Sequence, residues 1–366
     1  MRTAALLRYQ TMIAACLIFL PTMALAQTPT KDKTVRIGVG SRVINIIYPY
    51  LNMPLALGYW KSAGINVELI PMSGSVEAIQ QIVAGGVDFA MLNSGTMMQA
   101  NADNGLDLRG IMLVSATDWS LAVLSDSTIK EVRDFKGKII GVPALSTGGM
   151  TLLKDYLISN GLTPDRDVSI VPVGFGGPAY EALRSDRVQG LMFFQTGITG
   201  FENLGARLRV MFSPDWRKMP DFTLATSQKM INRDPDLVTA VVQGAIKGQV
   251  FSMANPDCAR RVQWKTWPET APTGANKESL AKWDLNLLAA QRTSMINAFN
   301  LAGGKLYGLY TPEMADTLQQ FLARNEVLKR KLPPQDYVIT KEGFFEAANG
   351  FDPAPIKKQA EECSGF

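Results

Sequence analysis

The chain of 366 residues contains no histidine. Because histidine is the base of Ser-His-Asp and Cys-His sites, those nucleophilic mechanisms are excluded. Zinc and iron sites built on histidine are excluded for the same reason. The sequence also lacks a G-x-x-x-x-G-K-[ST] phosphate loop and a D-x-[DN]-x-[DN]-G calcium loop. We therefore expect no cofactor, no metal site and no enzymatic activity.

Long apolar runs are scarce, and the one that stands out lies near the N-terminus. Residues 1–26 have the parts of a secretory signal peptide, with Arg2 and Arg8 before the run MIAACLIFL and an A-x-A motif ending at Ala26. The run is shorter than the roughly 20 residues that a membrane-spanning helix requires. The pattern predicts export and cleavage before Gln27.

Cysteine is also scarce, with three in the chain, and Cys16 lies inside the predicted leader. Export would leave Cys258 and Cys363 in an oxidising compartment, where two cysteines can form one disulfide. Cys363 lies in a C-terminal tail, residues 346–366, which stays ordered only if something ties it down. We predict a Cys258–Cys363 disulfide, with two unpaired thiols as the alternative.

A strong charge of either sign is missing too. Lysine and arginine total 37 against 33 acidic residues, and losing Arg2 and Arg8 with the leader would lower the formal charge from +4 to +2. This balance excludes a nucleic acid as partner. The length of the chain exceeds what one core organises well and favours two lobes. We expect the mature chain to be a soluble monomer.

What the sequence does contain is a regular alternation of strands and helices. The predicted strands are short runs rich in valine and isoleucine, and each run is flanked by turn-forming residues. Helical patterns separate most of these runs. Such alternation predicts βαβ units, mainly parallel sheets and an α/β fold. The predicted strands are Val35–Val39, Val67–Ile70, Val87–Leu92, Gly110–Val114, Lys138–Val142, Val168–Val173, Val188–Phe194 and Leu208–Phe212.

A weak internal repeat supports two similar sheets. The run VDFAM leads into Asn93-Ser-Gly, and the run VQGLM leads into Gln195-Thr-Gly. Two extended runs, Leu121–Ser125 and Phe222–Thr226, flank the middle of the chain and are interpreted as hinge strands. The predicted division is a leader at 1–26, lobe 1 at 27–121 and 225–345, lobe 2 at 122–224 and a tail at 346–366.

The segment from Pro54 to Gly95, with its motifs GYWKSAG, VELI and VDFAMLNSG, resembles a known family. So does KGKIIGVPALSTGGMTLLKDYLISNGL, and the likeness extends to about Glu269. The family is that of the SsuA/THI5-like, or NMT1-like, binding proteins of bacterial ABC importers. The resemblance implies a type II periplasmic-binding fold, with two lobes, two hinge strands and a cleft, and a membrane permease and ATPase as partners. Its pyrimidine-synthase enzymes use a histidine and a cysteine-rich motif, which this chain lacks.

In lobe 1, Arg42 follows the first strand and could hold a carboxylate or sulfonate with both guanidinium arms. The alternative is a solvated arginine of the loop. Tyr48 lies in the same loop and could either stack on a ligand or pack under the next helix.

Two polar turns of lobe 1 lie where an open α/β sheet binds its ligand, at the carboxyl ends of strands. The turn at Ser73 and Gly74 and the turn at Asn93 and Ser94 each open a helix. Capping is the structural role of such residues, and free N–H groups at the same place can hold an anion.

Lobe 2 provides the opposite wall of the expected cleft. The turn LSTGG after the strand KIIGV is the strongest candidate for an anion cradle, because its glycines let the backbone approach a ligand. Trp119 is expected to form the floor. The remaining candidates are Ser146, Thr147, Gly148, Phe175, Phe194 and Gln195.

The sequence thus indicates a periplasmic solute-binding protein of an ABC importer that makes and breaks no bond. A sulfonate or carboxylate is the expected ligand. The alternatives are a pyrimidine-type thiamine precursor as ligand, an enzyme on the same fold, or a sensor that presents its ligand to another membrane system.

Overall fold

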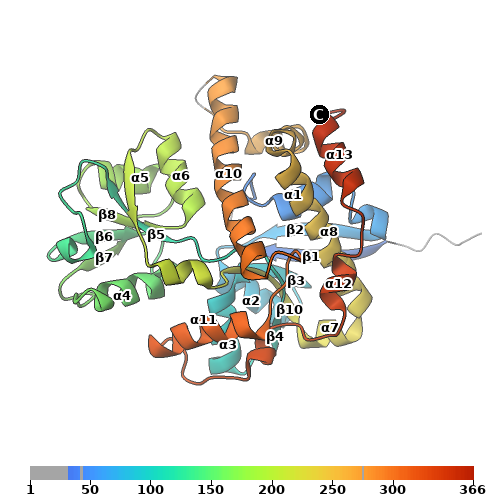
Figure 1. The fold of residues 1–366 in the computed structure, drawn as a ribbon, viewed down its shortest axis with the longest axis horizontal. Helices are drawn as coiled ribbons and strands as arrows, with labels where there is room; N and C mark the ends of the chain where they lie inside the picture. Colours follow the sequence, from blue (N-terminus) through green and yellow to red (C-terminus); the bar gives the residue numbers. More distant parts are fainter. Residues whose placement is uncertain (1–31, 42–43, 274–275) are drawn as a thin grey trace, which may run out of the picture. The chain divides into compact units, whose positions relative to one another are not determined.

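The computed structural model describes residues 32–41, 44–273 and 276–366. Two five-stranded sheets form its framework (Figure 1). The first has the order β2-β1-β3-β10-β4 and the second has the order β7-β6-β8-β5-β9. The strands of the first are β1 (Lys33–Val39), β2 (Ile65–Pro71), β3 (Phe89–Asn93), β4 (Leu108–Leu113) and β10 (Phe222–Ser227). Those of the second are β5 (Ser120–Leu124), β6 (Ile139–Val142), β7 (Ser169–Pro172), β8 (Gly190–Phe193) and β9 (Leu208–Met211).

The two sheets are built in the same way. In the first, β1 pairs in parallel with β2 and β3, and β10 runs antiparallel between β3 and β4. In the second, β6 pairs in parallel with β7 and β8, and β5 runs antiparallel between β8 and β9. The strands β3 and β8, which carry the repeated VDFAM and VQGLM runs, therefore hold equivalent places. This confirms the two α/β lobes expected from the repeat.

The connections between the lobes lie just before the runs predicted as hinges. Leu121–Ser125 and Phe222–Thr226 fall almost entirely within β5 and β10, inside the sheets, because their backbone groups are needed for the ladders. The chain instead crosses at residues 114–119 and 212–221. These crossing segments pair with each other, since the N–H of Thr117 donates to Met219 at 2.8 Å and the N–H of Asp221 donates to Ser115 at 2.9 Å. Below, lobe 1 means residues 32–113 and 222–366, and lobe 2 means residues 120–211.

Helices cover both sheets. Lobe 2 has α4 (Gly149–Ser159), α5 (Gly177–Arg184) and α6 (Gln195–Asn203). Lobe 1 has α1 (Pro49–Ala56), α2 (Ser75–Ala84), α3 (Ser94–Asn104), α7 (Gln228–Arg233), α8 (Pro235–Ala254), α9 (Pro256–Thr266), α10 (Lys277–Leu301), α11 (Pro312–Arg324), α12 (Phe344–Ala348) and α13 (Ala354–Glu362). Short 3-10 helices lie at Lys61–Ala63, Val132–Phe135, Pro214–Lys218, Pro268–Thr270 and Pro334–Tyr337.

Helix α8 forms much of the core of lobe 1. By length and composition it passes as a membrane-spanning helix, which the sequence analysis overlooked, but most of its apolar window is buried within the protein. The indole of Trp60, in the GYWKSAG motif, donates to the carbonyl of Val241 on α8 at 2.9 Å. Gly244 permits this contact, since a Cβ there would lie 2.2 Å from the Trp60 ring. Trp60 is thus an anchor between the end of the first helical segment and α8.

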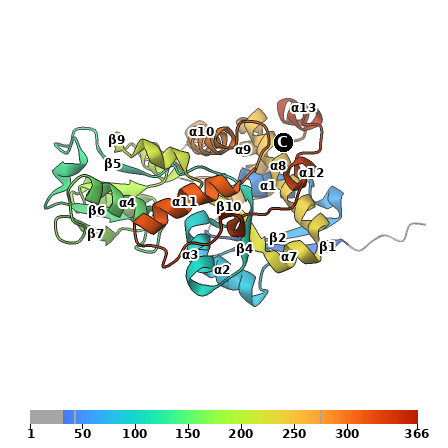
Figure 2. The same cartoon turned by 60° about the horizontal axis from the view of Figure 1, so that its bottom comes forward.

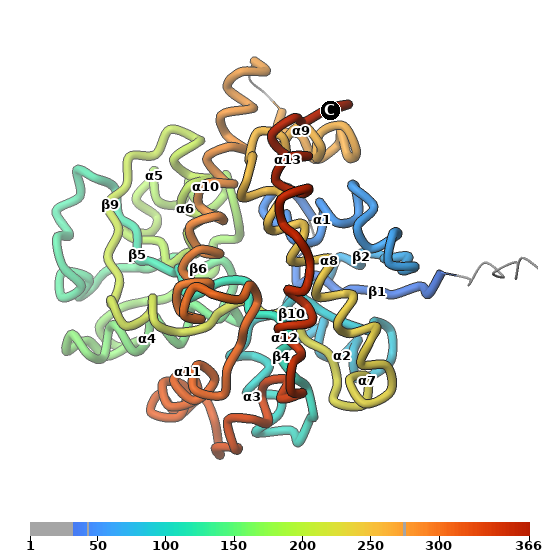
Figure 3. The backbone as a smooth tube through the Cα atoms, turned by 45° about the vertical axis from the view of Figure 1, so that its right-hand side comes forward, coloured from blue at the N-terminus to red at the C-terminus, as the bar shows by residue number. Residues whose placement is uncertain are grey.

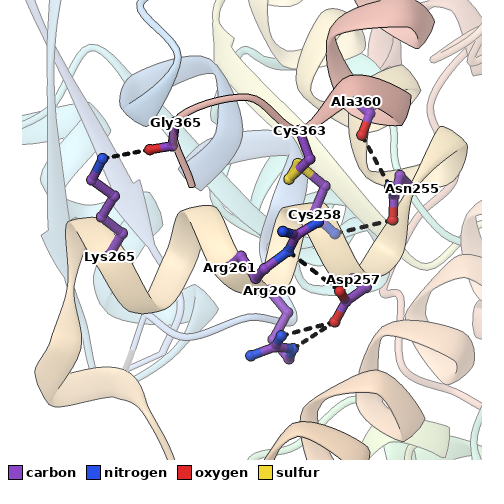
Figure 4. Close-up of a disulfide and its surroundings, with 9 residues drawn as sticks. All are labelled: Asn255, Asp257, Cys258, Arg260, Arg261, Lys265, Ala360, Cys363 and Gly365. Carbon is purple, nitrogen blue, oxygen red and sulfur yellow. Dashed lines mark hydrogen bonds and ion pairs between the residues drawn. A yellow bond between two sulfur atoms is a disulfide. The ribbon is translucent and has the colours of Figure 1, made fainter.

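A disulfide joins Cys258 in α9 to Cys363 at the end of α13, 105 residues apart (Figure 4). Asn255 reinforces this link, because its amide donates to the carbonyl of Ala360 at 3.0 Å while its oxygen accepts from the N–H of Cys258. Helix α13 packs on both α8 and α9, and Figure 3 shows α13 beside α9. The C-terminal tail is therefore fastened to lobe 1.

Two helices of lobe 1 reach lobe 2 on either side of the crossing segments. Helix α10 packs on α6, and the amide of Asn286 donates to Asn203 at 2.8 Å (Figures 1 and 3). At the end of α11, Asn325 donates to Asp155 of α4 at 3.0 Å, and Figure 2 shows α11 running toward α4. These contacts join the lobes in addition to the two crossing segments.

Candidate functional site

The polar turns of the two lobes meet at Asn93 and Gly148. A Cβ built on Gly148 would lie 3.0 Å from the amide nitrogen of Asn93. Asn93 ends β3 of lobe 1, and Gly148 precedes α4 of lobe 2. Both turns follow the carboxyl ends of strands, where open α/β sheets place their ligands. We call this contact and the residues around it the seam.

Asn93 is held in place by hydrogen bonds of its side chain and its backbone. Its oxygen caps α3 by accepting from the N–H of Thr96 at 3.1 Å, and its own N–H donates to Ser75 at 3.0 Å. Its amide nitrogen donates to the carboxylate of Asp221 in the second crossing segment. The side chain is therefore fixed by lobe 1 and a crossing segment, and it faces lobe 2.

Aromatic rings line the seam on the lobe 2 side. A Cβ on Gly149 would lie 2.3 Å from the ring of Trp119, so only glycine lets α4 begin this close to the indole. The Trp119 ring meets Phe194 edge-on with centroids 5.4 Å apart, and Phe175 lies 6.5 Å from Phe194. Phe175 is 60% exposed, so an apolar ring at this wall lacks a full cover. Such a surface favours a flat, apolar part of a ligand.

Two buried carboxylates and one guanidinium lie in the crossing segments, and sequence reasoning missed all three. Burial, with Asp118 nearby, raises the pKa of Asp221 to about 7, although Asn93 and Trp119 donate to it. Burial also raises the pKa of Asp118, which accepts hydrogen bonds from the Ser294 hydroxyl and the N–H of Gln195. Arg217 donates to the carbonyls of Thr117 and Trp119 at 2.9 and 3.0 Å. No spacing in the sequence signals this cluster, because Asp118 and Asp221 come from connections more than one hundred residues apart.

The other residues predicted in lobe 1 have varied surroundings. Tyr48 is buried and its ring meets Tyr50 edge-on, which favours its packing role. Ser73 is exposed, and both its N–H and its hydroxyl donate to Glu77. Gly74 is the N-cap residue of α2, and Ser94 is fully buried. Arg42 lies outside the described residues.

The predicted residues of lobe 2 also have varied surroundings. Ser146 is exposed, and the hydroxyl of Thr147 donates to the carbonyl of Ala144 at 2.9 Å. Gln195 begins α6 and gives its N–H to Asp118. The structure thus brings together one group of predicted residues at the seam: Asn93, Trp119, Gly148, Phe175 and Phe194.

The helices that start at the lobe 2 turns have no side-chain cap. This holds for α4 after Gly148 and for α5 after Gly176, whereas the first N–H of α6, that of Gln195, already donates to Asp118. An uncapped helix start leaves backbone N–H groups and the positive end of the helix dipole free to interact. This end of lobe 2 therefore has the electrostatic character of an anion-binding surface.

We compared the chain with known protein families and with known proteins. The family model described as NMT1/THI5 like matches residues 52–259. The chain is 24% identical over 260 residues to the riboflavin-binding protein RibY of Chloroflexus aurantiacus, which covers 68% of this chain and 73% of that protein.

Solved structures with the same fold include a binding protein and an enzyme. The periplasmic aliphatic sulphonate binding protein SsuA of Escherichia coli matches with a TM-score of 0.63 and 14% identity, covering 86% of this chain and 99% of SsuA. A mutant of the desulfurization enzyme DszB, in complex with biphenyl-2-sulfinic acid, matches with a TM-score of 0.58 and 14% identity, covering 87% of this chain and 100% of DszB. At this identity the likeness establishes the periplasmic-binding fold. Because the family model covers more than half of its residues, the chain belongs to the NMT1/THI5-like family.

Proposed function

We propose that this protein is a periplasmic solute-binding protein that captures a small organic molecule between its lobes and delivers it to an ABC importer. The observation that carries the proposal is the seam. Turns from both lobes meet at Asn93 and Gly148, next to the two paired segments on which the lobes are hinged. A ligand that contacts both turns favours the closed arrangement over an open one, which is how binding changes the population.

The ligand that we propose is a small organic anion of the sulfonate or carboxylate type with an apolar part. The uncapped starts of α4 and α5 support the anionic group. Trp119, Phe175 and Phe194 support the apolar part. Arg42 would provide the opposite charge from lobe 1. A pyrimidine-type thiamine precursor, which would use the aromatic wall more than the anion site, is the alternative.

In this proposal the 1–26 leader directs export, and the mature protein is a monomer in the periplasm. It docks on a membrane permease that an ATPase drives. SsuA is a periplasmic binding protein and RibY is a binding protein, which supports this role. A sensor on the same fold would close in the same way, so a permease and an ATPase encoded beside this protein would favour import.

An enzyme on this fold, as DszB is, remains the rival function. Two features of this chain count against it. The sequence has no histidine to act as a base, and both cysteines outside the predicted leader are joined in a disulfide. A thiol in a disulfide cannot act as a nucleophile. Conversion of any bound compound would contradict the proposal.

A thermal-shift screen of the mature protein tests the ligand class. The panel contains alkanesulfonates, aromatic sulfonates, aromatic carboxylates, flavins and pyrimidine thiamine precursors. A true ligand present at about 100 times its dissociation constant stabilises the fold by about 2.7 kcal/mol, which raises the melting temperature measurably. Small-angle scattering with that ligand should show a smaller radius of gyration and an unchanged mass. Failure of every class, or an unchanged radius at saturation, would contradict a hinged binding protein.

The variant Arg42→Ala tests whether the ligand has an anionic group that pairs with Arg42. If Arg42 pairs with it, binding should weaken by roughly 2–5 kcal/mol, because a desolvated charge would lose its partner. The stability of the unliganded protein should hardly change. Wild-type affinity in this variant would instead place Arg42 in a solvated loop.

A further inference from the structure

A cavity of about 490 Å³ lies between α6 of lobe 2 and α10 of lobe 1. Asp118 and Arg217 of the crossing segments also line it, so both lobes and both connections contribute. Its volume is in the range of small-molecule sites. Neither Asn93 nor Gly148 lines the cavity, although Gln195, which was predicted as a site residue, does.

Asp118 and Arg217, the charged residues contributed by the crossing segments, are both held in place by hydrogen bonds. They differ in the hydrogen-bonding capacity that is left for a ligand. The carboxylate of Asp118 is oriented by the Ser294 hydroxyl and the N–H of Gln195, which leaves it further acceptor capacity. Arg217 is committed elsewhere, because it donates to two carbonyls of the first crossing segment and to Ser120 at 3.0 Å. Its guanidinium also lies 4.2 Å from the centre of the Phe212 ring. This part of the cavity therefore presents an acceptor more readily than a donor.

The wall formed by α6 adds acceptors that have no partner among the described residues. Thr199 is only 7% exposed and lines the cavity, yet its hydroxyl makes no hydrogen bond there. Glu202 is exposed at the rim and makes no ion pair with any described residue. On the opposite wall, Asn297 of α10 is equally without a partner in the described part of the chain. The side chain of Thr199 is thus more than nine-tenths buried, lines the cavity and is free to bond a polar occupant there.

The charge balance indicates what this occupant is. Two carboxylates, Asp118 and Glu202, face a single guanidinium that already has partners. A donor-rich cation matches such a lining, and charge-assisted hydrogen bonds are the strongest available to it. The described residues contain no group of three or more side chains suited to a metal ion, which favours an organic cation over a metal.

We propose that this cavity binds an aliphatic amine, with one ammonium group at Asp118 and a second cationic or hydroxyl group toward Glu202. Gln195, Thr199 and Glu202 lie on one face of α6, and seven residues of helix rise by about 10 Å. A chain with two cationic ends separated by about this length would span the cavity and bridge α6 to α10. The amine would thereby join the two lobes beside their connections, independently of the solute at the seam.

Calorimetric titration of the solute-free protein with spermidine, putrescine and butylamine at low ionic strength tests the proposal. We expect saturable binding of one spermidine, weaker binding of putrescine and the weakest binding of butylamine. Glu202→Gln should weaken the binding of spermidine about tenfold or more, because one charge-assisted hydrogen bond is lost. Thr199→Val should weaken it less. Glu346→Gln, which removes an exposed charge from α12, is the matched control and should bind like the wild type.

Four results would overturn the proposal, and the first three concern the titrations themselves. They are no saturable binding of spermidine, equal binding by Glu202→Gln, or the same heat from magnesium chloride at matched ionic strength. Loss of spermidine binding in Gly149→Ala but not in Glu202→Gln would also refute it, because the amine would then occupy the seam. The solute-binding function is tested with other compounds, so one proposal can fail while the other stands.

Discussion

The two lobes share one strand order but differ in the two helix starts that meet at the seam, α3 of lobe 1 and α4 of lobe 2. In lobe 1, α3 begins with the side chain of Asn93 capping its N–H groups. In lobe 2, α4 begins at Gly149 without such a cap. A capped start is already satisfied, whereas an uncapped one keeps donors for another molecule. Lobe 1 therefore offers a rigid amide to the seam, and lobe 2 offers backbone N–H groups.

The lobes also differ in how they are supported. Lobe 1 has a large set of C-terminal helices and the Cys258–Cys363 disulfide. Lobe 2 has three helices and an aromatic core, in which Phe193 and Phe201 meet edge-on at 4.9 Å. We therefore expect changes to the disulfide to affect stability without affecting binding, and changes at the lobe 2 turns to affect binding.

The largest effect should come from removing the disulfide. Cys258→Ser with Cys363→Ser should lower the free energy of unfolding by about 2–4 kcal/mol, because the unfolded chain loses a constraint over a long loop. The affinity for ligand should stay the same, since α9 and α13 are remote from the seam. Urea unfolding measures the first effect and titration the second. Two titratable thiols per denatured, unreduced wild-type chain would show that no disulfide forms.

A smaller effect should come from Gly149→Ala, which tests the seam side of lobe 2. Its Cβ would overlap the Trp119 ring, so we expect a loss of about 1–3 kcal/mol in stability and a marked loss of ligand binding. Gly200→Ala, within α6, is the matched control, because nothing lies within 4 Å of a Cβ built there. Equal stability and binding in the two variants would remove Trp119 and α4 from the site.

The pH dependence of stability should report on the crossing segments. Because the pKa of Asp221 is raised from 3.8 to about 7 in the folded protein, the fold binds its proton more tightly than the unfolded chain does. The free energy of unfolding should therefore fall as pH rises from about 4 to about 7, by up to about 1.4 kcal/mol for each pH unit. Asp118, whose pKa is also raised by burial, contributes in the same direction.

Urea unfolding across this pH range, with wild type and Asp221→Asn, measures the effect. The variant should show a shallower fall, because one of the two buried carboxyls no longer titrates. Asp126→Asn, an exposed position of lobe 2, is the control. Parallel profiles for wild type and Asp221→Asn would contradict the assignment.

The smallest effect should come from the contact between α11 and α4. Asp155 accepts from Asn325 and lies 3.6 Å from the exposed guanidinium of Arg324. Such exposed pairs contribute about 1 kcal/mol or less, so Asp155→Ala should weaken ligand binding at most about fivefold by favouring the open form. Small-angle scattering should show a slightly larger radius without ligand. Ser159→Ala on the same helix, bonded only within α4, should change neither quantity.

Much of the fold could be predicted because it depends on local patterns. Short apolar runs between helical segments indicated the α/β class, and the repeated VDFAM and VQGLM runs indicated two equivalent sheets. The turns at Asn93 and Gly148 were recognised because strand ends and helix starts are marked by asparagine, serine and glycine. The placement of the hinges was less accurate. The sequence pattern of an extended segment is the same whether that segment connects two lobes or pairs within a sheet.

What the sequence by itself determined is the set of side chains that this protein can use and the elements from which it is built. The absence of histidine, the spacing of apolar residues and the glycine-rich turns are all properties of neighbouring residues. Only the tertiary structure decided that Asp118, Asp221 and Arg217 share one buried cluster, and that Gly149 lies against Trp119. These contacts join segments far apart in the chain, so they depend on how the lobes pack and leave no local signal.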